Sequence, residues 1–191
     1  MRRKDEEKQE RIKQAVMRLS LREGFAGTSV SKIAREAGVS PATVYIYYEN
    51  KEEMLKDIYL EYSQSAYQFL SDALEPEMSA RRLIETTMEM YYQFIEENEE
   101  IFSFVEQFSR CPVLSCQCGR QAGSGVHSCG LFGEIDRRKA AGEIRGCDDR
   151  SIAAFLFAPV REIAGKTYVT EEERDELLQE IIQLAVQALL V

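Results

Sequence analysis

The chain has 191 residues, of which 45% are hydrophobic and 30% are charged, and its formal net charge is −9. Such a chain can build a sizeable core, which excludes intrinsic disorder, and its acidity excludes a protein that coats nucleic acid or an anionic membrane without selectivity. No apolar run approaches the roughly 20 residues that cross a bilayer, and the first ten residues are densely charged, so we expect a cytoplasmic protein with no membrane span.

Two short helices joined by a tight turn follow a long amphipathic first helix, which is predicted over residues 4–23. From Thr28 onward, a Thr or Ser at the N-cap precedes apolar residues at helical spacing. Gly38 can take the left-handed backbone that ends this second helix. Ser40 can then cap a third helix that begins at Pro41, where a helix needs no N–H. This arrangement is typical of a helix-turn-helix that reads DNA.

The third helix presents a short outer face of hydroxyl and aromatic side chains. With Val44 and Tyr48 packed inward, the residues on or beside that face are Ser40, Pro41, Ala42, Thr43, Tyr45, Ile46 and Tyr47. The N-terminal end of such a helix enters the major groove, where hydroxyl groups can reach phosphate, and we expect Lys51 to be a further phosphate contact. Residues 1–51 hold 11 Lys and Arg against 7 Asp and Glu, whereas the remainder holds 13 against 26, so the positive charge lies at the DNA-reading end.

These residues resemble the tetracycline-repressor (TetR) family of bacterial transcription regulators over about residues 12–59. The resemblance is carried by I-A-R-E-A-G-V-S at residues 33–40, T-V-Y-I-Y-Y at residues 43–48 and K-E-E-M-L at residues 51–55. It implies a three-helix head on a larger helical body, and a function in blocking promoters until a small-molecule effector releases the DNA.

The resemblance also implies which side chains contact a double-stranded DNA operator: Thr28, Ser40, Thr43, Tyr45, Tyr47 and Lys51, with Ala42 and Ile46 facing bases. Two positions depart from the family pattern. Pro41 stands where many members have Lys, and Glu49 adds a negative charge nearby. Two sources of attraction to the DNA backbone are therefore absent.

Beyond residue 50, apolar residues recur at spacings of three and four, which predicts helices over residues 51–73, 80–97, 99–109, 129–141, 149–166 and 171–190. We therefore predict an all-α fold with an N-terminal helix-turn-helix head over residues 1–50 and a larger helical ligand-binding and dimerisation body over residues 51–191. The last two helices are apolar around more of their circumference than a monomer requires, which favours a homodimer through them. Two heads would then read a palindromic operator.

Aromatic and methionine side chains of the body either fill its core or line a cavity for the effector, whose identity the sequence does not encode. The candidates for ligand contact are Phe69, Met88, Tyr91, Tyr92, Phe104, Phe108 and Phe155. A stripe of such residues at helical spacing belongs to a hydrophobic core more often than to a ligand pocket.

A cluster of soft metal ligands offers an alternative function, that of a metal- or thiol-redox-sensing regulator. It comprises Cys111, Cys116, Cys118, His127 and Cys129. Thiolates and an imidazole can hold zinc, and a thiol pair can sense oxidants, but the spacing is not that of a zinc ribbon, and reduced loop cysteines are the simpler interpretation. No other cofactor is expected. With one histidine and no phosphate loop or nucleophile elbow, we predict that the chain is not an enzyme.

Overall fold

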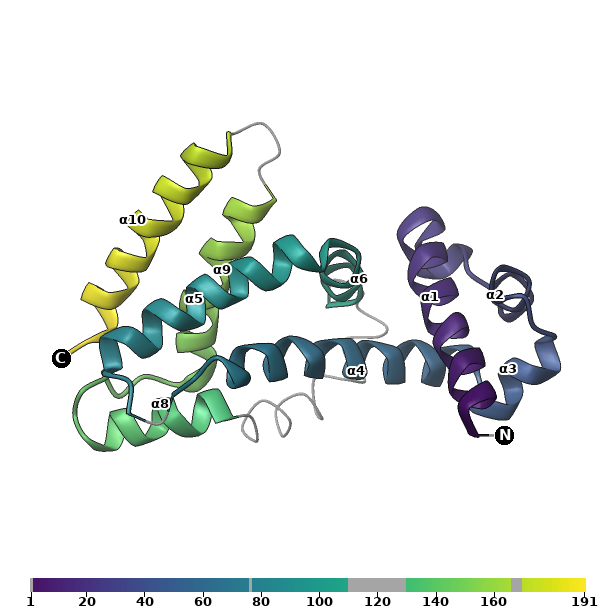
Figure 1. The fold of residues 1–191 in the computed structure, drawn as a ribbon, viewed down its shortest axis with the longest axis horizontal. Coiled ribbons are helices and arrows are strands. Elements are labelled where there is room, and N and C mark those ends of the chain that lie inside the picture. The colour runs from purple at the N-terminus through teal and green to yellow at the C-terminus, as the bar shows by residue number, and fades with distance from the viewer. Residues whose placement is uncertain (1, 76, 110–129, 166–169) are drawn as a thin grey trace. The chain divides into compact units, whose positions relative to one another are not determined.

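The structure, a computed structural model, describes residues 2–75, 77–109, 130–165 and 170–191 (Figure 1). Over these residues it is all-helical, as predicted. The helices are α1 (Arg2–Gly27), α2 (Val30–Ala37), α3 (Pro41–Tyr47), α4 (Lys51–Asp72), α5 (Ala80–Glu97), α6 (Glu99–Ser109), α8 (Gly130–Ala140), α9 (Asp149–Ala164) and α10 (Glu171–Leu189). Among these helices, none offers the long apolar stretch that a membrane crossing requires.

The chain folds into two compact units. The described residues within Met1–Gln64 and Glu99–Gln121 form the first unit, and those within Ser65–Asn98 and Ala122–Val191 form the second unit. The predicted head lies wholly within the first unit. Helix α4 contributes to both units, and α6 belongs to the first unit although it follows α5 of the second unit in sequence.

Helix α1 contains a break where the sequence predicts its end. Gly24 has a φ of 71°, a left-handed value that costs a residue without Cβ little, and one further turn continues to Gly27. Phe25, in that last turn, is half-buried and packs against the core of the first unit. The glycine therefore redirects the chain so that an aromatic side chain covers this core.

The core of the first unit joins five helices. Its buried side chains come from α1, α2, α3, α4 and α6, and they include Ile12, Ala15, Val16, Leu19, Ile33, Ala34, Val44, Met54, Leu55, Ile58, Phe104 and Phe108. The rings of Phe25 and Phe108 meet edge to face at 5.6 Å, and Tyr59 stacks on Phe108 at 4.1 Å. Both geometries are favourable for aromatic pairs. Helix α6 therefore completes the core that holds the helix-turn-helix.

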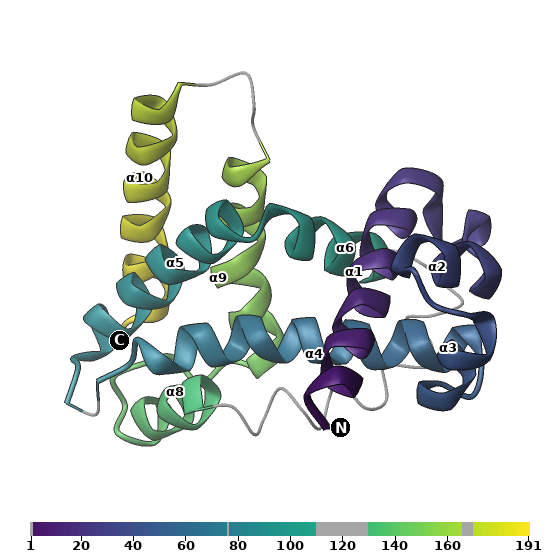
Figure 2. The same ribbon diagram turned by 45° about the vertical axis from the view of Figure 1, so that its right-hand side comes forward.

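The second unit is built on α5, which packs against α9 and α10 (Figure 2). Side-chain caps start these helices: Ser79 accepts from the Arg82 N–H at 3.2 Å, and Thr170 forms the predicted capping box with Glu173. The chain end is fastened by an antiparallel bridge between Ile144 and Leu190. These contacts leave one long face of α9 and one of α10 uncovered within the described residues.

Candidate nucleic-acid interface

The helix-turn-helix is held by the capping residues that the sequence indicates. The Ser29 hydroxyl accepts from the Lys32 N–H at 3.3 Å and so caps α2. Gly38 takes a φ of 66° at the end of α2, where its N–H donates to helix carbonyls. The Ser40 hydroxyl accepts from the Thr43 N–H at 3.1 Å, with Pro41 in the first turn of α3. Local backbone chemistry therefore fixes the angle between α2 and α3.

Helix α3 buries one side and exposes the other. Val44 and Tyr48 are 1% and 6% exposed, whereas Tyr45 and Ile46 are 57% and 77% exposed. Burial raises the pKa of Tyr48, in agreement with its predicted place in the core. Tyr45 and Ile46 are thus exposed together on the outer face of α3, and DNA contact by this face stays a prediction.

The other predicted contacts of α3 lie around that exposed pair. Ser40, Pro41 and Ala42 are exposed at the helix start, and Thr43 is half-buried with its hydroxyl 2.9 Å from that of Ser40. Tyr47 is half-buried at the other end, where its hydroxyl donates to the Asp5 carbonyl of α1 at 3.3 Å. The structure thus brings these residues of the predicted surface together on one short helix.

Thr28 and Lys51 have structural roles that the sequence pattern does not indicate. Thr28 is 3% exposed, and its hydroxyl donates to the Phe25 carbonyl at 2.8 Å. The Lys51 ammonium donates to the carbonyls of Phe25 and Thr28 at 3.0 and 3.1 Å. It thereby satisfies backbone oxygens left open at the end of α1. No sequence signal marks these carbonyls as partners, and DNA contact by either side chain stays a prediction.

The two roles of Lys51 can be separated with Lys51→Met, which keeps the aliphatic stem and removes the ammonium. We expect the free energy of unfolding to fall by about 1–2 kcal/mol, because two partly buried carbonyls lose a charged donor. Urea denaturation measures this loss. A variant of unchanged stability whose DNA affinity has a salt slope smaller by about 0.9 per bound protomer would contradict the structural role and favour the phosphate contact.

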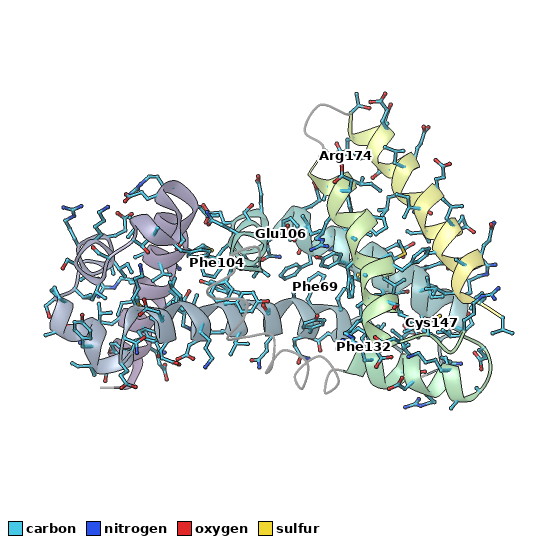
Figure 3. All side chains as sticks on the ribbon, turned by 180° about the vertical axis from the view of Figure 1, so that it is seen from behind. Phe69, Phe104, Glu106, Phe132, Cys147 and Arg174 are labelled. Carbon is cyan, nitrogen blue, oxygen red and sulfur yellow. The ribbon has the colours of Figure 1, made fainter. Side chains whose placement is uncertain are left out.

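The candidate ligand contacts divide between the two units. Phe104 and Phe108 are fully buried in the core of the first unit, and Phe104 on α6 is marked in Figure 3. In the second unit Met88 is fully buried, whereas Phe69, Tyr91 and Tyr92 are half-buried. The Phe69 ring lies 5.6 Å from that of Phe94, and the Tyr91 ring lies 4.7 Å from that of Phe157. Ligand contact by any of them stays a prediction, and packing accounts for Phe104 and Phe108.

The predicted metal or redox cluster, Cys111 to Cys129 with His127, lies outside the described residues. Among the residues that the structure describes, no group of His, Cys, Asp and Glu side chains is placed to hold a metal ion. Cys147 is exposed on the segment between α8 and α9 (Figure 3). The sensor function therefore stays an untested alternative.

Comparisons with known proteins agree with the geometry. Residues 12–58 match the family model described as bacterial regulatory proteins, tetR family. An uncharacterized HTH-type transcriptional regulator of Haemophilus influenzae is 29% identical over 113 residues, which are 57% of this chain and 58% of that protein. A fatty acid metabolism regulator protein of Bacillus subtilis is 25% identical over 72 residues, which are 38% of this chain and 37% of that protein. The chain thus covers less than two thirds of these curated relatives.

Solved structures match over the full length. The crystal structure of a TetR family transcription regulator from Marinobacter aquaeolei VT8 is 26% identical, with a TM-score of 0.77 over 100% of this chain and 99% of that one. A TetR-family regulator from Haemophilus influenzae has the same fold, with a TM-score of 0.80 at 21% identity over 96% of this chain and 99% of that one. The chain therefore belongs to the TetR family of helix-turn-helix transcription regulators.

Proposed function

We propose that this regulator is a cytoplasmic homodimeric repressor that binds a palindromic operator through the outer face of α3 and leaves it when a small molecule binds. One observation carries the DNA-binding part of the proposal: Tyr45 and Ile46 are 57% and 77% exposed next to the hydroxyls of Ser40 and Thr43. Apolar groups suit thymine methyls in the major groove, and hydroxyls suit phosphate. Tyr45 and Ile46 are not among the side chains that pack against the core of the first unit.

Two apolar stripes of the second unit support dimerisation. On α10, Leu184 is 55% exposed, and it shares a stripe with Leu177, Ile181 and Ala188 at helical spacing. On α9, Phe155 is 46% exposed with Ala154 and Ala158 beside it. A second copy that presents the same two stripes would bury them in a four-helix interface. Phe155, proposed from the sequence as a ligand contact, suits this interface better than a cavity.

Release by an effector is supported by half-buried aromatic side chains in the second unit. Phe69, Tyr91 and Phe157 each keep part of the ring exposed while contacting another ring or lying next to one. Aromatic surfaces of this kind hold small apolar molecules. Such a molecule would act by favouring a conformation of the dimer in which the two α3 helices no longer match the spacing of the half-sites.

The variant Tyr45→Ala tests the DNA-binding surface. We expect its affinity for the operator, recovered by selection from random duplexes, to fall about tenfold or more, because a central exposed aromatic contact is lost. We expect an unchanged melting temperature, since the side chain lies largely in solvent. Fluorescence anisotropy of a labelled duplex gives the affinity, and circular dichroism gives the melting curve.

Tyr45→Phe is the matched control, because it keeps the ring and removes only the hydroxyl. If the ring makes the contact, this variant retains most of the affinity. Wild-type affinity in Tyr45→Ala would refute the proposed DNA-binding face, and failure of the wild-type protein to select any duplex would refute the DNA-binding function.

A further inference from the structure

The positive side chains of the first unit are mostly engaged within the protein. Lys8, Lys13, Arg18, Arg22, Lys32 and Lys56 all form ion pairs, and Lys51 binds carbonyls. Among the described side chains of this unit, Arg11 and Arg35 are the two cations without a hydrogen bond or ion pair. A cation left unpaired beside a DNA-reading helix is available to a phosphate.

Ion pairs with α1 fix which side of α2 faces outward. The Lys32 ammonium lies 2.7 Å from the Glu23 carboxylate and donates to the Gly27 carbonyl at 2.8 Å. One turn later, the Glu36 carboxylate lies 3.5 Å from Arg18 and 3.8 Å from Arg22. The side of α2 that carries positions 32 and 36 is therefore turned towards α1.

The opposite edge of α2 carries Ser31 and Arg35, which are exposed and one helical turn apart. The Arg35 carbonyl accepts from the Gly38 N–H at 3.2 Å, so Arg35 stands immediately before the turn that leads to Ser40. Arg35 therefore lies in the last turn of α2, three residues before Gly38 and five before the Ser40 cap of α3. This start lacks a cation of its own, because position 41 is proline.

Arg11 has a different setting. It lies on α1 with one guanidinium nitrogen 3.6 Å from where a Cβ on Gly38 would be, in a surface hollow that is also lined by Glu6, Glu7 and Glu10, with Gln9 and Lys13. Three carboxylates around one free guanidinium repel a polyanion. Of the two unpaired arginines, only Arg35 is on the helix-turn-helix, and the acidic neighbour next to it, Glu36, is already paired with α1.

We propose that Arg35 binds a phosphate of the DNA backbone beside the turn and supplies the attraction that Pro41 does not. This rests on the proposed DNA-binding function. Arginine suits the role because its planar guanidinium can donate hydrogen bonds to two phosphate oxygens at once. The contact is to the backbone, so it strengthens binding to any duplex and anchors α2 while α3 reads the bases.

The test compares the variants Arg35→Ala and Arg35→Lys with Arg145→Ala in the otherwise complete protein. Arg145 is the matched control: it is exposed in the second unit, its side chain has no partner among the described residues, and its removal changes the net charge equally. Affinities for the selected operator and for a scrambled duplex are measured by anisotropy from 50 to 200 mM salt. Circular dichroism establishes that each variant is folded.

We expect Arg35→Ala to lower the salt slope of both duplexes by about 1.8, which is about 0.9 for each protomer of the bound dimer, so that its deficit relative to wild type shrinks about 12-fold across this salt range. Arg35→Lys keeps the slope, because the charge remains. Equal slopes for Arg35→Ala and Arg145→Ala would overturn the assignment, and a loss confined to the operator would replace it with a base contact. If the wild-type protein binds neither duplex, the proposed function itself fails.

Discussion

The double variant Phe155→Glu, Leu184→Glu is expected to be a folded monomer. Both side chains are about half exposed in the isolated chain, so their replacement leaves the core of the second unit intact. In a dimer, however, each glutamate would be buried against apolar surface without a partner, at a cost of several kcal/mol per interface. Light scattering at micromolar concentration measures the mass, and circular dichroism measures the retained helix content.

The monomer should also bind the operator at least about 100-fold more weakly, because a dimer gains effective concentration at the second half-site. Gln179→Glu is the matched control. Gln179 is exposed on another side of α10, so this change adds negative charge without touching the apolar stripe. A double variant that remains dimeric would show that the copies meet through some other surface.

The variant Phe108→Ala should weaken the first unit severely. This side chain is fully buried, with Tyr59 stacked on it at 4.1 Å and Phe25 edge-on at 5.6 Å. Deleting a buried Phe ring costs about 3–5 kcal/mol, partly from lost burial and partly from the cavity left behind. Urea denaturation, followed by the circular dichroism of the helices, measures the loss.

Phe102→Ala is the control on the same helix, because Phe102 is half-buried. We expect its effect to be at most about half as large, since less apolar area leaves the solvent. Equal losses for the two variants, or stability unchanged in Phe108→Ala, would contradict the role of Phe108 in the core of the first unit.

Helix starts, helix ends and the turn could be predicted from the sequence because each depends on the backbone preferences of a few neighbouring residues. Gly38, Ser40 and Pro41 predict the turn and the start of α3 through their own backbone preferences, and the structure confirms both. The motifs in residues 33–55 likewise identified the family that the comparisons confirm, and membership of that family of regulators agrees with the prediction that the chain is not an enzyme.

The packing partners of α6 could not be predicted in this way. The spacing of Phe104 and Phe108 shows that α6 buries a face, and it does not show which helix covers that face. From the sequence pattern both residues are predicted to belong to the body as ligand candidates, whereas the structure packs them with α1. The carbonyl partners of Lys51 are hidden for the same reason, because Phe25 is 26 residues away.

The contribution of α6 to the first unit has a consequence for how the protein is made. The helix-turn-helix leaves the ribosome early, but Phe104 and Phe108 are synthesised only after α4 and α5. Until they arrive, the apolar sides of Phe25 and Tyr59 face water, and closing this core requires a contact across most of the first half of the chain. Such long-range closure is slow. The helix-turn-helix is therefore translated first, but its core is completed only after α6 has been made. A chain truncated within α5 would leave the apolar surface of this core exposed and would be prone to aggregate.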